Sequence, residues 1–225
     1  MPVQDLIEEM NAYYARRAPW HDSYMNYTTP EAMEKLLAPI IDIVERYLKD
    51  RNVLEIACGT GNWTRVLAGR ARSVTATDVS KEHIKIAREK NSDIDKVTYA
   101  IIDAYKINEL PGEFEIAFAA DFWSHIPKSM ITPFLEKLHR KVKKKGWVIF
   151  LDMLYRKEFD KDGFFYDDEG NRINKRTLPD GSRFRVVKNF PTREELEKQI
   201  AGYATHAEYI EDRELMRWLL IYNLK

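Results

Sequence analysis

Two glycines stand in the stretch V-L-E-I-A-C-G-T-G-N-W, residues 53–63, between an apolar run and a segment that favours a helix. A glycine turn at the start of a helix leaves backbone N–H groups unpaired and points the positive end of the helix dipole at a ligand. Gly59 and Gly61 therefore predict a site for a nucleotide-like ligand. Dinucleotides, nucleoside triphosphates and other adenosine compounds all bind at such loops, so the glycines alone do not choose among them.

The residues around the glycines argue against the first two ligands. A dinucleotide loop needs a third glycine, which lets the helix pack closely on the strand. Thr64 stands at that position here, and Trp63 would crowd a pyrophosphate. The lysine and hydroxyl residue that complete a triphosphate loop are also missing after the second glycine.

Three carboxylates stand within or at the end of successive predicted strands. Glu55 lies within the first strand, where dinucleotide folds normally hold an apolar residue. Asp78 ends V-T-A-T-D, about 20 residues further on, where a carboxylate accepts hydrogen bonds from the ribose hydroxyls. Asp103 ends Y-A-I-I-D, where a carboxylate can bind the adenine amino group. Together they predict an adenosine-bearing ligand without a pyrophosphate.

The elements that would position these residues alternate between strands and helices. The expected strands are 53–57, 73–77, 97–102, 114–119 and 147–154, and the helices between them are 63–69, 81–90 and 129–144. Two helices precede them, over 4–17 and 30–50, and the second has Thr29 as its N-cap and Pro30 at its first position. Apolar strands separated by helices are typical of a doubly wound, mainly parallel sheet.

The pattern changes after residue 154. Residues 155–185 are rich in aromatic residues, charges and turn dipeptides, and they show no helical period. A strand is expected over 183–188, a helix with a capping box over 192–200, and a closing antiparallel pair over 205–212 and 214–224. The chain, 1–225, thus reads as one domain, with 155–190 laid over an edge as a substrate-side excursion and hairpin.

Composition restricts the class of protein. The 225 residues include 36 basic and 36 acidic side chains, so no net charge draws the chain to nucleic acid. Cys58 is the only cysteine, which excludes an internal disulfide, and no cluster has metal-ligand spacing. No apolar run reaches the roughly 20 residues that span a bilayer, and the N-terminus does not resemble a signal peptide. We expect a cytoplasmic monomer or homodimer with no metal, no nucleic-acid partner and no membrane insertion.

The order of these features resembles that of the class I S-adenosylmethionine-dependent methyltransferases, which carry acids at the first three strands and paired glycines after the first. The resemblance implies S-adenosylmethionine as cofactor and S-adenosylhomocysteine as product. It implies that Gly59 and Gly61 let the backbone approach the methionine moiety, and that Glu55 orders the loop or binds through water. Ala57 departs from the motif because it replaces the first glycine. A purely structural glycine turn in another α/β protein is the alternative.

Three other stretches extend the resemblance over nearly the whole chain. Y-Y-A-R-R-A-P-W-H-D at 13–22 is similar to the N-terminal helix of small-molecule methyltransferases related to quinone-biosynthesis enzymes, so residues 1–29 are expected to form a lid over the cofactor. F-W-S-H-I-P at 122–127 is similar to their loop after strand four, and 176–190 resembles a hairpin of an uncharacterised bacterial subgroup. The implied α/β fold is a Rossmann-like sheet of seven mostly parallel strands, with helices on both faces and an antiparallel final pair.

The resemblance implies a set of cofactor-binding residues on the N-terminal helix, the glycine loop and the strand ends. They are Tyr14, Arg17, Glu55, Ala57, Cys58, Gly59, Thr60, Gly61, Trp63, Asp78, Val79, Asp103, Ala104 and Ala120. The candidate substrate-binding residues are Tyr24, Phe122, Trp123 and Tyr166. For Tyr14, Phe122 and Trp123, a place in the apolar core is the competing interpretation.

Two histidines are candidate catalytic residues. Methyl transfer needs the nucleophile, the methyl carbon and the sulfur on one axis, and it needs a base only where the nucleophile is protonated. His125 follows the fourth strand, and His21 stands where relatives usually show tyrosine. Either could act near neutral pH. His125 could instead hold its loop by hydrogen bonding, and His21 could lie on the surface.

The sequence therefore predicts an enzyme that transfers a methyl group to O, N or C of a small-molecule acceptor. The alternatives are an RNA or protein methyltransferase and a non-catalytic module that binds S-adenosylmethionine or S-adenosylhomocysteine. The proline pair that marks methylation of base amines and glutamine is missing after the fourth strand, which disfavours the first alternative.

Overall fold

The structure, a computed structural model, describes residues 2–25, 27, 29–161 and 163–225. Its α-helices are α1 (Val3–Arg17), α2 (His21–Met25), α3 (Pro30–Leu36), α4 (Ala38–Leu48), α5 (Asn62–Arg70), α6 (Lys81–Lys90), α7 (Ile131–His139) and α8 (Arg193–Ile200). Shorter 3-10 turns are η1 (Ala18–Trp20), η2 (Ala104–Glu109), η3 (Trp123–His125), η4 (Lys128–Met130) and η5 (Lys157–Asp160). The strands are β1 (Asn52–Ile56), β2 (Ser73–Asp78), β3 (Val97–Ile101), β4 (Phe114–Ala120), β5 (Val142–Met153), β6 (Phe164–Tyr166), β7 (Arg172–Thr177), β8 (Arg183–Val187), β9 (Ala204–Asp212) and β10 (Arg217–Leu224). Among these described helices, none is long and apolar enough to cross a membrane.

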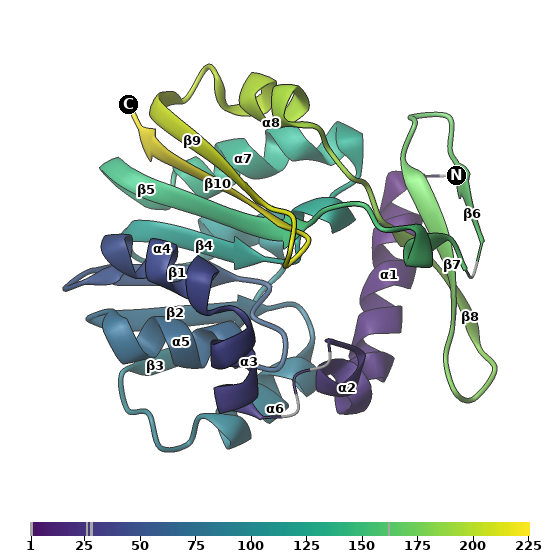
Figure 1. The fold of residues 1–225 in the computed structure, drawn as a ribbon, viewed down its shortest axis with the longest axis horizontal. Helices are drawn as coiled ribbons and strands as arrows, with labels where there is room; N and C mark the ends of the chain where they lie inside the picture. The colour runs from purple at the N-terminus through teal and green to yellow at the C-terminus, as the bar shows by residue number, and fades with distance from the viewer. Residues whose placement is uncertain (1, 26, 28, 162) are drawn as a thin grey trace.

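In the described part of the chain, seven strands form a main sheet in the order β3-β2-β1-β4-β5-β10-β9 (Figure 1). The strands β1 to β5 pair in parallel, and β10 is antiparallel to both β5 and β9. The predicted Rossmann-like α/β class, with its antiparallel final pair, is confirmed. The strand order reverses between β1 and β4, and ligands of open α/β sheets bind at the carboxyl ends of the strands beside such a reversal.

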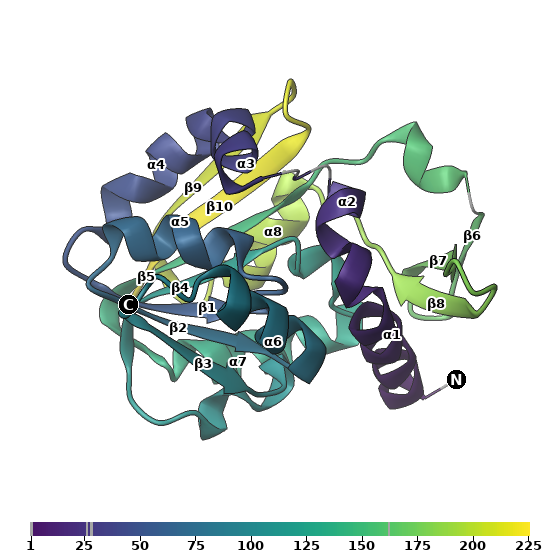
Figure 2. The same cartoon turned by 90° about the horizontal axis from the view of Figure 1, so that it is seen from below.

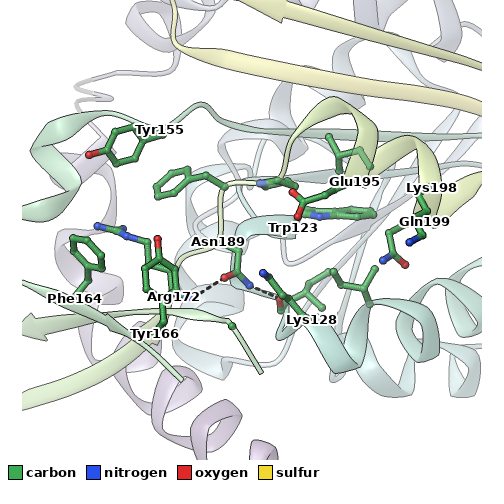
Figure 3. Close-up of a pocket in the computed structure, with 16 residues that line it drawn as sticks. Trp123, Lys128, Tyr155, Phe164, Tyr166, Arg172, Asn189, Glu195, Lys198 and Gln199 are labelled. Atoms are coloured by element: carbon green, nitrogen blue, oxygen red, sulfur yellow. Dashed lines mark hydrogen bonds between the residues drawn. The ribbon is translucent and has the colours of Figure 1, made fainter. Parts of the chain in front are cut away.

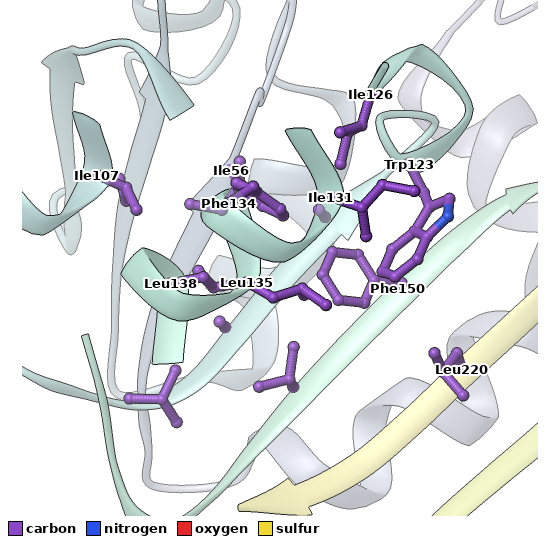
Figure 4. Close-up of a cluster of buried hydrophobic side chains, with 14 of the residues drawn as sticks. Ile56, Ile107, Trp123, Ile126, Ile131, Phe134, Leu135, Leu138, Phe150 and Leu220 are labelled. Carbon is purple, nitrogen blue, oxygen red and sulfur yellow. The ribbon is translucent and has the colours of Figure 1, made fainter. Parts of the chain in front are cut away.

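Apolar side chains cover both faces of the main sheet. Leu54 and Ile56 of β1 belong to the cluster under α7 and α8, whereas Val53 belongs to the cluster under α3, α4 and α5. Figure 4 shows Phe134 and Leu135 of α7 in the first of these clusters. Burying one such side chain fully stabilises the folded chain by about 1.5–3 kcal/mol. Packing on both faces therefore holds the main sheet in place.

Helix α1 stands between the main sheet and a second, antiparallel sheet in the order β6-β7-β8 (Figures 1 and 2). Leu6 and Met10 pack in an apolar cluster with side chains of the second sheet, whereas Ile7 joins the core of the main sheet. Arg185 of β8 donates to Glu9 through its backbone N–H and its guanidinium, at 2.6 and 2.8 Å. These contacts hold α1 on both sides.

The predicted single helix over 30–50 is wrong, because the chain breaks at Leu37 into α3 and α4. Leu37 has φ −99° and ψ 12°, which are not helical angles. Pro39 follows in the first turn of α4, where its missing N–H would have no partner in any case. The N-cap prediction is confirmed, since Thr29 Oγ1 accepts from the N–H of Ala32 at 3.1 Å.

The predicted helix over 129–144 is too long at both ends. Helix α7 ends at His139, and β5 begins at Val142, which is buried and pairs with Phe114 of β4. Before the hairpin that 176–190 resembles, the chain forms β6 and most of β7, which the sequence does not predict. The early start of β5 arises from pairing with β4, a strand distant in the sequence, which local periodicity does not record. Strands β6, β7 and β8 pair with their neighbours along the chain.

Candidate active site

A cleft of about 510 Å³ opens at the carboxyl edge of the main sheet. Residues from the ends of β1, β2 and β4 line it, and side chains of α1 and α2 close one side. Arg176 of β7 and Lys188, which directly follows β8, contribute a further wall. Small-molecule sites usually occupy about 300–1,000 Å³, so the cleft has the size of such a site.

The glycine loop, residues 57–61, takes left-handed backbone angles at alternate positions. Ala57, Gly59 and Gly61 have φ angles of 52°, 55° and 80°. Glycine adopts these angles freely, whereas alanine loses about 1–2 kcal/mol there. The loop keeps its path because the N–H of Gly59 donates to Asp78 Oδ2 at 2.9 Å, which ties the end of β1 to the end of β2.

The two glycines have different surroundings. A Cβ on Gly59 would lie 3.7 Å from His21 Nε2, and Gly59 lines the cleft. A Cβ on Gly61 would lie 2.6 Å from Asn91 Nδ2 and 2.9 Å from the Cβ of Ala87, so this glycine lets α5 and α6 pack closely. Gly61 is not among the described residues that line the cleft. Only Gly59 is thus placed to bring the backbone near a ligand.

The carboxylate of Asp22 fastens α2 to the glycine loop. Its Oδ1 accepts from Thr60 Oγ1 at 2.6 Å and from Asn62 Nδ2 at 2.9 Å, and its Oδ2 accepts from Lys90 Nζ at 2.5 Å. Burial alone would raise the pKa of Asp22, but the hydrogen bonds from Lys90, Thr60 and Asn62 hold it below its ordinary value. The N-terminal segment is therefore joined to the loop by the hydrogen bond from Thr60 and to α6 by the ion pair with Lys90.

Glu55 is buried beneath the loop. Its side chain is 2% exposed, and its Oε2 accepts from Thr64 Oγ1 at 2.6 Å. Burial, together with the nearby Asp78, raises the pKa of Glu55 to about 8, despite the hydrogen bond from Thr64. The contact joins β1 to the first turn of α5, and the carboxyl group is mostly protonated at neutral pH.

Two neutral histidines lie beside Asp78. The ring of His83 meets the ring of His21 edge to face at 5.3 Å, and His83 Nδ1 lies 3.8 Å from Asp78 Oδ1. Burial, with Arg17 nearby, lowers the pKa of His21 to about 3, and burial also lowers that of His83. Both ring nitrogens of His83 and the Nδ1 of His21 have no hydrogen-bond partner among the described residues. This end of the cleft therefore offers unused polar groups to a ligand.

A second pair of neutral groups lies in the cleft at the carboxyl end of β4. The Tyr14 hydroxyl lies 2.9 Å from His125 Nε2, and His125 Nδ1 lies 2.6 Å from the carbonyl oxygen of Val187. Since a carbonyl can only accept, Nδ1 carries the proton and Nε2 accepts from Tyr14. Burial, with Lys188 nearby, lowers the pKa of His125 to about 3, and burial raises the pKa of Tyr14.

Two buried ion pairs support the same region. Lys188 Nζ lies 2.8 Å from Ser124 Oγ and 3.5 Å from Asp152 Oδ1. Burial lowers the pKa of Lys188; it would raise that of Asp152, but Lys188 keeps the Asp152 pKa below its ordinary value. Arg217 pairs with Asp121, whose φ of 54° turns the chain at the end of β4. Breaking such a pair leaves an uncompensated buried charge, which typically costs about 3–5 kcal/mol.

Most of the residues that the sequence assigns to the site line this cleft. They are Tyr14, Arg17, His21, Tyr24, Glu55, Ala57, Cys58, Gly59, Thr60, Trp63, Asp78, Val79, Ala120, Phe122 and His125. Asp103 lies outside the described lining of the cleft. Its Oδ1 caps η2 by accepting from the N–H of Tyr105 at 2.8 Å. Ala104 opens the same turn and also lies outside.

Trp123 and Tyr166, which the sequence assigns to the acceptor, lie outside the described lining of the cleft. Trp123 is 2% exposed, and its indole packs edge-on against Phe150 in the core. Tyr166 belongs to β6, and both residues line a second cavity rather than the cleft. The core interpretation of Trp123 is therefore the one that fits the structure.

Lys188 and His83, which line the cleft, and Asp22, which supports the glycine loop, have no functional signal in the sequence. Lys188 ends an alternating strand pattern in which a lysine reads as solvent-exposed, and only the second sheet buries it against Asp152. Asp22 stands in the N-terminal motif, but its partners are 38 to 68 residues away. His83 lies on a helix face that reads as core. Among the residues that the structure describes, no three His, Cys, Asp or Glu side chains gather to hold a metal ion.

Comparison with known proteins identifies relatives of the whole fold and of its glycine loop. A family model described as a methyltransferase domain matches residues 53–146. The solved DhpI-SAM-HEP complex is 30% identical, with a TM-score of 0.72 over 98% of this chain and 97% of that one.

Two curated relatives match shorter stretches. A ubiquinone biosynthesis O-methyltransferase of Bordetella avium is 26% identical over 144 residues, which are 63% of this chain and 59% of that protein. A tRNA/tmRNA (uracil-C(5))-methyltransferase of Pseudomonas aeruginosa is 29% identical over 114 residues, which are 49% of this chain and 31% of that protein. The chain thus spans less than two thirds of the length of these two relatives.

The left-handed positions of the loop predict opposite effects of exchanging alanine and glycine. Gly61→Ala should lower the free energy of unfolding by more than about 2 kcal/mol, because it adds left-handed strain and overpacks the contact with Asn91 and Ala87. Ala57→Gly should change it by about 0 to +1 kcal/mol, since relief of strain is offset by the entropy of glycine. Urea unfolding measures both. A Gly61→Ala chain as stable as the wild type would show that the loop follows another path.

The raised pKa of Glu55 predicts a pH-dependent contribution to stability. The folded chain holds this proton more tightly than the unfolded chain, so the contribution is full below the ordinary pKa of 4.5 and is lost as the pH rises through about 8. Glu55→Gln removes the titration. Relative to wild type, its free energy of unfolding should therefore improve steadily between about pH 5 and about pH 9. Parallel stability curves for the two proteins would contradict the assignment.

Proposed function

Because the chain belongs to the class I S-adenosylmethionine-dependent methyltransferases, we propose that it methylates an oxygen of a small-molecule acceptor bound in the cleft at the carboxyl edge of the main sheet. The observation that carries the proposal is the arrangement of the cleft. The glycine loop, Asp78 and the two histidines occupy one part, and Tyr14, His125 and Lys188 occupy another. Oxygen is proposed because the Bordetella relative is an O-methyltransferase.

The cofactor is S-adenosylmethionine, and the cleft has unused groups that fit it. Arg17 Nε and Trp63 Nε1 are buried without a hydrogen-bond partner among the described residues. Asp78 already accepts backbone N–H groups from Gly59 and Ser80, one at each oxygen, and each oxygen keeps a second lone pair. We infer that Asp78 would hold the ribose hydroxyls and that the turn at Gly59 would hold the methionine tail. The bound cofactor supplies an activated methyl group.

The chain's own task is alignment and exclusion of water. Methyl transfer to a nucleophile is an in-line displacement, so holding the acceptor on the axis of the breaking bond accounts for much of the possible rate gain. Tyr14 donates a hydrogen bond to His125 Nε2, which leaves its own oxygen free to accept one from an acceptor hydroxyl. The proton of that hydroxyl would pass to solvent as the methyl group is transferred. His125 would then act as a positioning residue, because protonating its buried ring beside Lys188 is unfavourable.

The small size of the acceptor rests on the enclosure of the cleft. Side chains of α1 and α2 close it on one side, and η5 and the second sheet close another. A nucleic-acid or protein acceptor would have to enter as a single extruded group. The uracil-C(5)-methyltransferase match covers only about a third of that relative, so it does not favour an RNA substrate here. The cytoplasmic location and the monomeric or homodimeric state stay predictions.

The proposed ribose contact predicts weaker cofactor binding when Asp78 is removed. Asp78→Ala should raise the Kd for S-adenosylhomocysteine at least about tenfold, equivalent to about 1.4 kcal/mol. Asp78→Asn, which keeps one acceptor oxygen, should lose less. Asp95→Ala, an exposed carboxylate on the surface, is the matched control and should bind normally. Isothermal titration calorimetry measures each Kd, and unchanged affinity in Asp78→Ala would move the ribose site elsewhere.

The function itself is tested by a methyl-transfer screen. The wild-type chain with S-adenosylmethionine should methylate hydroxyl or carboxyl compounds in preference to amines and thiols of the same skeleton. If the cofactor binds but no class of small molecule is methylated, a non-catalytic binding module is the better description.

With the acceptor that this screen identifies, the pH dependence of kcat distinguishes a positioning role of His125 from a general-base role. Because the pKa of His125 is about 3, kcat should show no acid limb from this residue between about pH 5 and about pH 8. Tyr14→Phe should lower kcat about tenfold or more with an unchanged Kd for S-adenosylhomocysteine. An acid limb near pH 6.5 that disappears in His125→Gln would instead identify His125 as a general base.

A further inference from the structure

A second cavity, of about 670 Å³, lies between the second sheet and the helices α7 and α8. Figure 3 shows Phe164, Tyr166 and Arg172 of the second sheet on one side of it, and Lys198 and Gln199 of α8 on the other. Its size falls within the range of about 300–1,000 Å³ that small-molecule sites occupy. The proposed methyl transfer makes no use of it.

A stack of two aromatic rings separates this cavity from the cleft. The rings of Phe159 and Phe190 lie 5.2 Å apart and are inclined by only 21°. Phe159 lines the cleft, and Phe190 lines the second cavity. The carbonyl of Phe159 accepts from Asn174 Nδ2 at 2.9 Å and from Arg172 at 3.3 Å, so the partition is tied to β7. The two spaces therefore have separate linings.

The walls of the cavity expose aromatic rings that the fold does not cover. Tyr155, Phe164 and Tyr166 are 49%, 40% and 64% exposed. Trp123 and Leu196, both buried, contribute apolar surface beneath them. Large apolar side chains that gather around a concavity usually mark a binding site, because leaving them in water is unfavourable.

The charges at the cavity are unbalanced. Lys128, Arg172 and Lys198 line it, with Glu195 as the one acidic lining residue that the structure describes. Arg172 pairs with Asp160, and Glu195 is used in the capping box of α8. Neither Lys128 Nζ nor Lys198 Nζ has an ion-pair partner among the described residues. The ammonium of Lys128 lies against Gly170, where a Cβ would stand 3.5 Å away. An anionic group on a ligand would complete this set.

We propose that the second cavity binds an aromatic carboxylate, with the ring against the Phe164 and Tyr166 side and the carboxylate at Lys128. The site is distinct from the methyl-transfer cleft, since the Phe159–Phe190 stack stands between them. The inference rests on the cavity lining alone and does not depend on the proposed methyl acceptor.

Calorimetry with cinnamate and its neutral analogue cinnamamide tests the site in the full chain saturated with S-adenosylhomocysteine. Wild type should bind cinnamate more tightly than cinnamamide. Lys128→Gln should weaken cinnamate about fivefold or more and leave cinnamamide within about twofold. Tyr166→Ala should weaken both ligands about threefold or more, because it removes apolar contact rather than charge.

Two matched controls keep the result specific. Phe165→Ala removes the neighbouring ring of β6, which is 41% exposed but does not line the cavity, and Lys85→Gln removes an exposed lysine of α6. Neither should change either Kd. The proposal is overturned if wild type binds neither compound at millimolar concentration. It is also overturned if Lys128→Gln and Tyr166→Ala bind cinnamate as wild type does, since binding would then lie elsewhere.

Discussion

The carboxylates at the carboxyl edge of the main sheet must each be paired, and the contacts that pair them also build the cleft. Asp78 accepts a hydrogen bond from the N–H of Gly59 and so ties the glycine loop to the end of β2. Asp22 holds α2 on that loop through Thr60 and on α6 through Lys90, and Asp152 holds Lys188 beside Ser124. Removing one partner of a buried charge pair such as Lys188–Asp152 typically costs about 3–5 kcal/mol, so this pair fixes its wall more firmly than apolar packing alone would.

The proposed function depends on polar groups of the cleft that have no hydrogen-bond partner among the described residues. The end near Asp78 keeps free lone pairs and histidine nitrogens, which suits a polar ligand such as the ribose and methionine groups of the cofactor. The end near Tyr14 and His125 is neutral and desolvated. A neutral surrounding favours alignment of an acceptor over its deprotonation by a charged base, so positioning is the main contribution we assign to this pair.

Local signals in the sequence were sufficient for the parallel sheet and for placing the glycine-loop residues in one cleft. Glu55, Gly59 and Asp78 each stand at a strand or turn whose position short-range patterns define. Lys188 could not be assigned in this way, because its burial depends on a sheet that forms only when β7 and β8 pair over α1. For Trp123 the sequence was misleading in the opposite way. Its place after β4 suggested a contact with the acceptor, but its ring packs in the apolar core.

The same limit applies to the break at Leu37 and to the early start of β5, where tertiary pairing overrides helical periodicity. The second cavity was likewise hidden, because its lining comes from β6, β7, the segment after β8 and α8, which are far apart along the chain.

A crystal structure of the chain with S-adenosylhomocysteine would test the assignment of the cleft most directly. We expect the ribose hydroxyls at Asp78, the methionine tail over Gly59, and the sulfur facing the Tyr14 hydroxyl across a space that an acceptor can fill. A product molecule seated away from Gly59 and Asp78, or a sulfur turned away from Tyr14 and His125, would contradict the assignment.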